Sequence, residues 1–300
     1  MTSVAVVAHE GKSLGGGLDE LRRVLALEGV DDPLWFEVPK SRKAPKKARA
    51  AVEAGADLVI VWGGDGMVQR CIDALAGSDA TIAIIPAGTA NLLASNLEIP
   101  HDVEEAVGVA LHGARRKLDV GTFNGERFAV MAGAGWDALM IRDADGTLKD
   151  RFGRIAYVAT GVRHVREPRF KTSIKVDGRR WFSGKASCVL FANVGKVFGG
   201  IEAFDDARPD DGQLDIGVLT AKGWLQWTRA LARTAVGNAD RSPFVSTTRG
   251  KSIRVKLGRA VRYELDGGER GTAKRIKVDV EAGAVTVCVP DPHDEEGSVQ

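Results

Sequence analysis

The arrangement of apolar and polar residues changes about one third of the way along the chain. In the first 117 residues, short apolar runs alternate with segments whose apolar residues recur at helical spacing. This alternation is typical of a parallel, doubly wound α/β sheet. The expected strands are Val4–Ala8, Leu34–Val38, Leu58–Trp62 and Thr81–Ile85, and the expected helices are Leu18–Leu27, Ala44–Ala54 and Val68–Leu75.

Beyond about Lys117, strand-like runs outnumber helices, and turn dipeptides such as Asn124-Gly125, Asp177-Gly178 and Asp211-Gly212 separate them. We therefore expect an α/β domain over residues 1–117, a mainly antiparallel β-sandwich domain over 118–290, and a polar tail over 291–300. The strands expected in the second domain are Leu118–Thr122, Arg127–Met131, Ser173–Val176, Ala186–Ala192, Leu214–Leu219, Ser252–Leu257, Tyr263–Leu265 and Ala284–Val289, with two helices near Leu148–Val165 and Trp224–Val236.

Composition and charge exclude several classes of protein. With 300 residues, 44% of them hydrophobic and 27% charged, the chain is an ordinary folded protein long enough for two domains. A formal charge of +2 argues against bulk binding of nucleic acid. Basic residues crowd only the stretch 40–49, which is either a solvated helix start or a patch for phosphates or an anionic membrane.

The start of the chain predicts a strand and not a signal peptide, because Met1–His9 has neither a charged segment nor a long apolar one. No stretch approaches the roughly 20 apolar residues that span a bilayer. The cysteines Cys71, Cys188 and Cys288 lie far apart and form no metal-binding spacing. We therefore expect a cytoplasmic protein. The sequence leaves its oligomeric state open.

The strongest candidate site is Gly63-Gly64-Asp65-Gly66, which directly follows a buried strand. Glycines let the backbone approach a polyphosphate and expose N–H donors, while the carboxylate suits Mg²⁺ or a water near the phosphates. An ordinary strand-ending turn is the alternative.

Two weaker glycine-containing motifs precede Gly63–Gly66 in the chain. Gly11-Lys12-Ser13 is not a P-loop because Val6 replaces the first glycine, and Gly15–Gly17 is either a tight turn or a phosphate-facing loop.

A second loop, Pro86-Ala87-Gly88-Thr89-Ala90-Asn91, also follows a buried strand and opens a helix. Thr89 is expected to cap that helix and to offer a hydroxyl, and Asn91 is expected to bridge the two loops. Alternatively, both residues only cap the helix.

Together these motifs resemble the catalytic domain of diacylglycerol kinases and sphingosine kinases. The later segments Asn193–Gly200, Arg208–Asp215 and Glu264–Gly267 occur in the family's order, so the resemblance spans nearly the whole chain. It implies a nucleotide-binding first domain like that of NAD kinases and phosphofructokinases. It also implies a peripheral membrane enzyme that transfers the γ-phosphate of ATP to the hydroxyl of a membrane lipid, of diacylglycerol or sphingoid type, with Mg²⁺.

The resemblance also implies roles for individual residues. Gly63, Gly64, Asp65, Gly66, Gly88, Thr89 and Asn91 would hold the nucleotide, with Asp65 organising the phosphates and metal. Asp211, with the backbone oxygens of Arg208 and Gln213, would hold a structural Mg²⁺; the alternative is an ordinary Asp-Gly hairpin turn. The late acidic motif would supply the base. It is altered here to Asp266-Gly267-Gly268-Glu269, so Asp266 or Glu269 must take that role, or the role is missing.

Two further departures distinguish the chain from many bacterial diacylglycerol kinases. Met67 stands where they have threonine, and Leu92 stands where they have aspartate, which resembles the sphingosine kinase branch. Two alternatives stay open: an NAD kinase-like enzyme, which shares GGDG, and a nucleotide- or lipid-binding protein that has lost its base. Trp224 and Trp227 on a predicted helix suggest membrane docking, or else a helix packed on the second domain's sheet.

Overall fold

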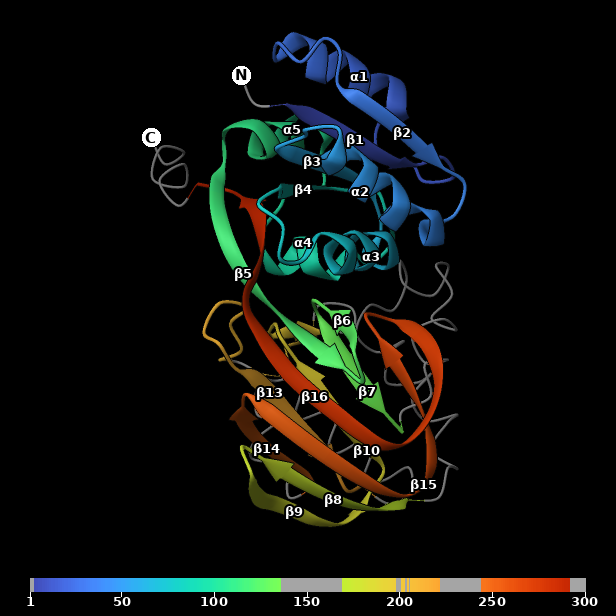
Figure 1. Cartoon of the computed structure of the whole chain (residues 1–300), viewed down its shortest axis with the longest axis vertical. Helices are drawn as coiled ribbons and strands as arrows, with labels where there is room; N and C mark the ends of the chain where they lie inside the picture. The colour runs from blue at the N-terminus through green and yellow to red at the C-terminus, as the bar shows by residue number, and fades with distance from the viewer. Residues whose placement is uncertain are drawn as a thin grey trace. The chain divides into compact units, whose positions relative to one another are not determined.

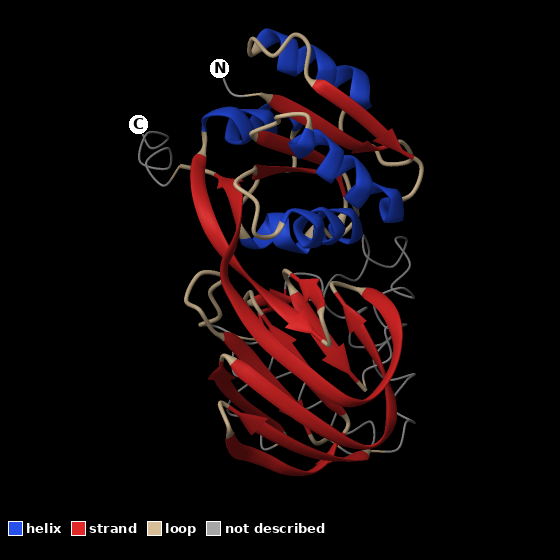
Figure 2. Ribbon diagram, in the orientation of Figure 1, coloured by secondary structure: helices blue, strands red, loops and turns tan. Residues whose placement is uncertain are grey.

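The computed structural model describes residues 3–135, 169–197, 201–202, 204, 206–221 and 244–291. The chain forms two compact units, one made of Met1–Leu118 with Gly283–Gln300 and the other of Asp119–Ala282. In the part of the chain that is described, helices belong to the first unit and the second is built of strands (Figures 1 and 2). No described helix is both long and apolar enough to cross a bilayer.

The first unit contains a parallel sheet of apolar, mostly buried strands that are rich in valine and isoleucine. Strands β3 and β4 run in register from Leu58 opposite Thr81 to Gly63 opposite Pro86, so they end at the same edge. The spatial order is β2 (Leu34–Val38), β1 (Val4–His9), β3 (Leu58–Gly63), β4 (Thr81–Pro86) and the last part of β16 (Gly268–Val289).

Helices cover both faces of this sheet (Figure 1). Helix α1 (Gly17–Leu27) packs on α5 (Val103–His112), and α2 (Ala44–Glu53) packs on α3 (Asp65–Leu75). The doubly wound prediction is confirmed. One boundary matters for function: α3 begins at Asp65 and not at Val68, so the carboxylate of GGDG lies in the first turn of a helix. The two remaining helices are short, η1 (Ser41–Lys43) and α4 (Leu92–Asn96).

The described part of the second unit consists of antiparallel strands whose alternate residues share one apolar core. The long strand β15 pairs with β8 through its first half, with β7 at its end, and with β16 along both. The strands are β5 (Ala114–Phe123), β6 (Glu126–Phe128), β7 (Met131–Ala134), β8 (Phe170–Val176), β9 (Arg179–Ala186), β10 (Cys188–Ala192), β11 (Lys196–Val197), β12 (Ile201–Glu202), β13 (Leu214–Leu219), β14 (Val245–Gly250), β15 (Ser252–Leu265) and β16.

Two of the predicted turns form because their residues tolerate left-handed backbone. Asn124 and Gly125, which join β5 to β6, have φ of 51° and 96°, and Asp177 and Gly178, which join β8 to β9, have 48° and 79°. Positive φ at both central positions is the signature of type I′ turns, whose twist suits antiparallel pairs.

The structure differs from the sequence-based prediction in several places. Helix α5 was not expected, and the run Arg127–Met131, expected as one strand, is divided between β6 and β7. The two strands expected at Ser252–Leu257 and Tyr263–Leu265 are one strand, β15, and the polar strands β9 and β14 were not expected. The end of β16, which was assigned to the second domain, belongs to the first unit because Thr286 and Val287 pair with β4. The predicted helices 148–165 and 224–236, including Trp224 and Trp227, lie outside the described residues.

The core of the second unit predicts a steric limit at Gly121. A Cβ there would lie 2.1 Å from the ring of Phe128, which is fully buried. Gly121→Ala should therefore lower the free energy of unfolding by about 2 kcal/mol, because the ring must move within a packed core. Gly271→Ala is the control, since a Cβ at that strand position meets nothing within 4 Å. Urea unfolding of both variants checks this, and equal stability would contradict the packing described.

Candidate functional site

The two predicted glycine loops touch each other at the edge of the first unit's sheet. Gly64 precedes α3, and Gly88 lies between β4 and α4. A Cβ on Gly88 would lie 2.4 Å from the Cα of Gly64, and one on Gly64 would lie 3.0 Å from the Cα of Gly88. A side chain at either position would force the loops apart, so the two loops meet backbone to backbone.

Asp65 joins the second loop to the first. Its Oδ1 accepts a hydrogen bond of 2.6 Å from the backbone N–H of Leu92, the first residue of α4. Burial raises the pKa of Asp65, and backbone hydrogen bonds, those of Leu92 and Leu93 foremost, partly oppose that rise. The carboxylate is half-buried and lies in the first turn of α3, where the helix dipole favours a negative charge.

The side chain of Asn91 shapes its own loop and does not bridge the two loops as predicted. Its Oδ1 accepts from the N–H of Gly88 at 2.9 Å, while its Nδ2 donates to the carbonyl oxygens of Pro86 and Gly88 at 2.8 and 3.0 Å. Asn91 is buried and has φ of 47°, a left-handed conformation that asparagine tolerates better than most residues. The bridge comes from Asp65 instead.

Thr89 and Gly66 are the exposed members of the two loops. The prediction that Thr89 caps the following helix is wrong, because Asn91 occupies the N-cap position of α4 and no side chain caps it. Gly63 is buried against Met67, where a Cβ would lie 2.9 Å from the Met67 sulfur. The backbone of Gly64 and Gly66 and the hydroxyl of Thr89 are thus the groups placed to meet a phosphate.

The third glycine run, Gly15–Gly17, is a tight turn. The N–H of Gly16 donates to Oε2 of Glu20 at 2.6 Å, and the N–H of Gly17 donates to the carbonyl oxygen of Leu14 at 2.9 Å. These two donors are engaged within the turn, so it does not offer the row of N–H groups that a phosphate loop needs.

In the second unit, Asp266 is a buried structural carboxylate. It opens the turn between β15 and β16 with φ of 45°, and it is 6% exposed. Its Oδ2 accepts from the N–H of Ala129 at 2.8 Å, and its Oδ1 accepts from Val130 and Met131 at 2.9 and 2.8 Å. Three backbone donors thus hold the side chain that the sequence offered as a candidate base.

Glu269, the other candidate base, lies on β16 opposite Glu264 with a side chain that is 48% exposed. The pairing passes from Tyr263 opposite Gly271 to Glu264 opposite Glu269, so Arg270 is an extra residue on β16. This bulge accommodates one additional residue beside the turn. It gives a structural account of the unusual Gly-Gly spacing, and it leaves Glu269 accessible while Asp266 is not.

Asp119 is a buried polar residue that the sequence reasoning missed. Its Oδ2 accepts from the N–H of Gly212 at 2.6 Å, and its own N–H donates to the carbonyl oxygen of Pro209 at 2.6 Å. Asn193 extends the network, because its Nδ2 donates to the carbonyl oxygens of Asp119 and Ala129 at 2.8 and 2.9 Å. A signal was available, since a carboxylate in the otherwise apolar run 118–123 is unusual.

This network holds the turn that was predicted to bind Mg²⁺. Asp211 Oδ1 accepts from the N–H of Gln213 at 2.9 Å, and Asp211 Oδ2 lies 3.5 Å from Nη2 of Arg249. One carboxylate with the backbone oxygens of Arg208 and Gln213 is a donor set that suits a hard cation with bound waters. No group of three or more His, Cys, Asp or Glu side chains forms a metal cluster among the described residues. The donor types fit the ion, with Arg249 as a competing cation.

Two family models match the chain. Residues 11–123 match the Diacylglycerol kinase catalytic domain, and residues 130–289 match the YegS C-terminal NAD kinase beta sandwich-like domain. A Diacylglycerol kinase of Bacillus subtilis is 28% identical over 75% of this chain and 75% of its own. A protein of Pseudomonas aeruginosa named Probable lipid kinase YegS-like is 30% identical over 80% of this chain and 79% of its own.

Solved structures agree in fold. A diacylglycerol kinase structure from Bacillus anthracis str. Sterne matches with a TM-score of 0.75 at 21% identity, over 97% of both chains. An NAD kinase from Archaeoglobus fulgidus in complex with ATP matches with a TM-score of 0.53 at 11% identity, over 98% of this chain and 96% of its own. The motifs, the fold and the two matching domain models together place the chain in the family that unites the diacylglycerol kinases with the YegS-like lipid kinases.

Proposed function

We propose that this protein is an ATP-dependent lipid kinase that transfers the γ-phosphate to the hydroxyl of a diacylglycerol or sphingoid-type lipid. One observation carries the proposal: two glycine loops meet backbone to backbone, with a half-buried carboxylate between them. Phosphoryl transfer needs mainly positioning and electrostatic stabilisation, which such loops supply. The named relatives support lipid as the acceptor.

Each residue then has a separable task. The N–H groups of Gly64 and Gly66 and the hydroxyl of Thr89 bind phosphate oxygens, whereas the N–H of Gly88 is already donated to Asn91. Asp65 orients the phosphate region from its fixed hydrogen bond to Leu92. A magnesium ion, when bound, neutralises developing negative charge on the phosphates. Glu269 is the accessible carboxylate that takes the proton from the lipid hydroxyl.

The NAD kinase-like fold and the shared GGDG motif keep one second candidate, phosphorylation of NAD. Purified protein with radiolabelled ATP should be offered extracted membrane lipids and, separately, NAD, and the labelled products identified by mass. Labelled phospholipid supports the proposal. Labelled NADP would instead identify the protein as an NAD kinase. Binding of ATP without any labelled product would indicate a binding protein that has no kinase activity.

Asp65→Asn should reduce turnover by at least about 100-fold, because the charge that orients metal and phosphate is lost. The hydrogen bond from Leu92 can persist, since the amide oxygen still accepts it. Asp79→Asn, at an exposed carboxylate of the same unit, is the control and should leave turnover unchanged. Near-normal activity of Asp65→Asn would refute the role.

The same variant should change how stability depends on pH. Burial raises the pKa of Asp65 in the folded protein above its unfolded value, so its ionised form destabilises the fold at neutral pH and the protonated form does not. Asp65→Asn should therefore melt at the same or a higher temperature at pH 7, with the gain disappearing as the pH falls through the raised pKa. Thermal melts between about pH 7 and pH 4 test this, and a lower melting temperature at pH 7 would contradict it.

Mutation of the two candidate bases, Asp266 and Glu269, should affect different properties of the protein. Asp266→Asn should lose about 3 kcal/mol or more of stability, because an amide nitrogen would then face a backbone N–H donor. Glu269→Gln should keep the melting temperature and lose at least about 100-fold in turnover. An active Glu269→Gln variant, or a fully stable but inactive Asp266→Asn, would reverse the assignment.

Magnesium should stabilise the second unit through Asp211. Adding Mg²⁺ to chelator-treated protein should raise its melting temperature, and Asp211→Ala should abolish the rise. Asp210→Ala, at the exposed neighbouring position, is the matched control and should keep it. Melting temperatures that do not respond to Mg²⁺ or to chelator would argue against an ion at this turn and would favour Arg249 as the counter-charge of Asp211.

A further inference from the structure

The basic residues of the second unit are concentrated in two segments of its sheet. Residues 170–186 and 251–262 carry ten Lys and Arg side chains against a single carboxylate, Asp177. The whole chain has a formal charge of only +2, so the rest of it is net negative. The near-neutral total therefore conceals a strongly positive region.

Strand register arranges these side chains in rows. Arg254 of β15 lies opposite Lys175 of β8 on one side and Lys277 of β16 on the other, and Lys175 lies opposite Arg180 of β9. Four cations thus stand in one row across four adjacent strands. The second row is Ser183, Ser173, Lys256 and Arg275, and we call the exposed side chains of both rows the cationic face.

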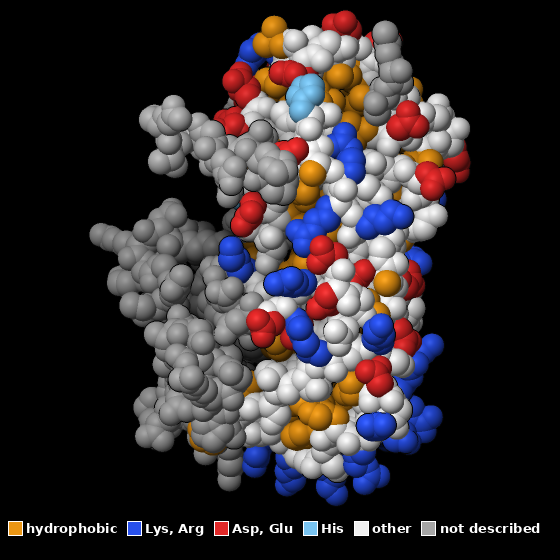
Figure 3. Space-filling view, turned by 90° about the vertical axis from the view of Figure 1, so that its left-hand side faces the viewer, with side chains coloured by type: hydrophobic (Ala, Val, Ile, Leu, Met, Phe, Trp, Pro, Cys, Tyr) orange, Lys and Arg blue, Asp and Glu red, His pale blue; other side chains and the backbone are white. Residues whose placement is uncertain are grey.

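The cationic face is the solvent side of the sheet. The alternate residues Ile174, Val255 and Ile276 point into the core and are at most 2% exposed, while Lys175 and Lys256 are exposed. Figure 3 shows Lys and Arg gathered along the lower edge and the lower right of the molecule.

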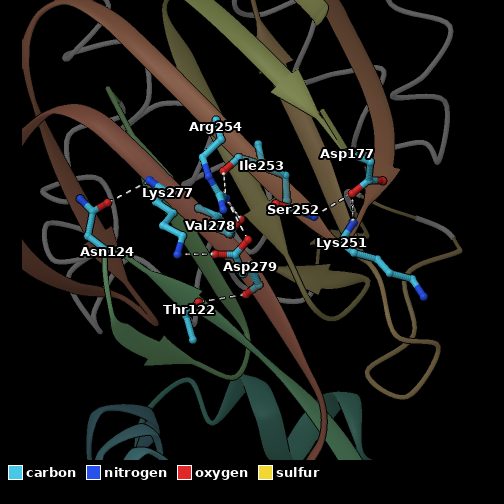
Figure 4. Close-up of polar contacts among 10 residues, drawn as sticks. All are labelled: Thr122, Asn124, Asp177, Lys251, Ser252, Ile253, Arg254, Lys277, Val278 and Asp279. Atoms are coloured by element: carbon cyan, nitrogen blue, oxygen red, sulfur yellow. Dashed lines mark hydrogen bonds and ion pairs between the residues drawn. The ribbon is translucent and has the colours of Figure 1, made fainter. Parts of the chain in front are cut away.

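Few carboxylates neutralise these charges. Asp279 pairs with Arg254 at 2.8 Å and with Lys277 at 3.4 Å, and both cations point toward it (Figure 4). Burial acts to raise the pKa of Asp279, but hydrogen bonds from Arg254 and Ser252 and the nearby positive charges outweigh it and lower that pKa. Among the described residues, Lys175, Arg180 and Lys256 have no ion-pair partner.

Stability does not explain this arrangement, because like charges directly opposite each other on a sheet are destabilising. Lysines do protect edge strands from pairing with other chains, and that accounts for β9. It does not account for the inner strands β8, β15 and β16. Solubility would be served equally by alternating acidic and basic side chains.

We propose that the cationic face docks the protein on an anionic lipid bilayer. The proposal rests on the proposed function, since a lipid kinase must reach substrate in a membrane. The positive charge of the cationic face is complementary to anionic headgroups. Each Lys or Arg near such a surface strengthens binding about fivefold. Exposed Arg259 and Arg262 continue along β15 toward Glu269 of β16, and Arg262 lies 3.8 Å from the Glu269 carboxylate, so docking and chemistry use the same pair of strands.

The test is vesicle binding in the absence of ATP. The intact protein should co-sediment with phosphatidylglycerol–phosphatidylcholine vesicles, bind pure phosphatidylcholine far less, and dissociate as salt is raised. Lys175→Gln with Lys256→Gln should weaken binding to the anionic vesicles at least tenfold while the melting temperature stays unchanged or rises, because repulsion is relieved.

A matched variant separates this face from the basic stretch of the first unit. Lys43→Gln with Lys46→Gln removes the same two charges from exposed positions in η1 and α2 and should leave vesicle binding near normal. Loss of binding in this variant alone would move the docking surface to residues 40–49. Equal binding to neutral vesicles, or preferential capture of duplex DNA over vesicles, would overturn the proposal.

The docking and the activity can fail independently. On diacylglycerol dispersed in detergent, Lys175→Gln with Lys256→Gln should phosphorylate as fast as the unmodified protein. If no lipid is phosphorylated by any variant while charge-dependent vesicle binding persists, the proposed function fails and the docking surface stands. If lipid is phosphorylated but the double variant binds vesicles normally, the docking surface fails alone.

Discussion

The candidate nucleotide site depends on one steric constraint, the contact between the backbones of Gly64 and Gly88. A Cβ at either position would lie within 3.0 Å of the other residue's backbone, so the two loops can meet only without side chains. Parallel strands β3 and β4 bring the loops to one edge of the sheet. The hydrogen bond from the N–H of Leu92 to Asp65 ties helix α4 to the Gly63–Gly66 loop. The two loops present backbone N–H groups, the hydroxyl of Thr89 and the carboxylate of Asp65, which together suit phosphate and its metal ion.

Buried carboxylates play the corresponding part in the second unit. Asp266 gathers three consecutive N–H groups of residues 129–131, and Asp119 gathers the turn around Gly212. Each offsets the desolvation of its charge by accepting hydrogen bonds from backbone that strands leave unpaired. These two acids position segments of chain, whereas Glu269 and Asp211 keep oxygens accessible. The division between structural and available carboxylates follows from burial, not from residue type.

The register of the strands determines where the charges of the second unit lie. No two of Arg180, Lys175, Arg254 and Lys277 are neighbours in sequence, yet the register places all four in one row. A sum over the chain gives nearly zero charge, while the sheet exposes a positive face. For a protein proposed to act on a membrane lipid, the local field would matter more than the total charge.

The sequence alone determined the local features of this protein. Alternating periodicity predicted the parallel sheet, Asn-Gly and Asp-Gly dipeptides predicted the turns, and Gly63–Gly66 with Pro86–Asn91 predicted the loops, because each depends on the conformational preferences of a few adjacent residues. The family resemblance rested on the same short motifs.

Tertiary structure decided which of these residues are available for chemistry and which only hold the fold. It buried Asp266 against three N–H groups, exposed Glu269 beside a bulge, returned the end of β16 to the first unit, and aligned cations from four strands. Apart from the exposure of Glu269, which belongs to a local hairpin, these outcomes depend on the pairing of segments far apart in the chain. Such pairing is set by packing and register over whole sheets, which no local pattern encodes.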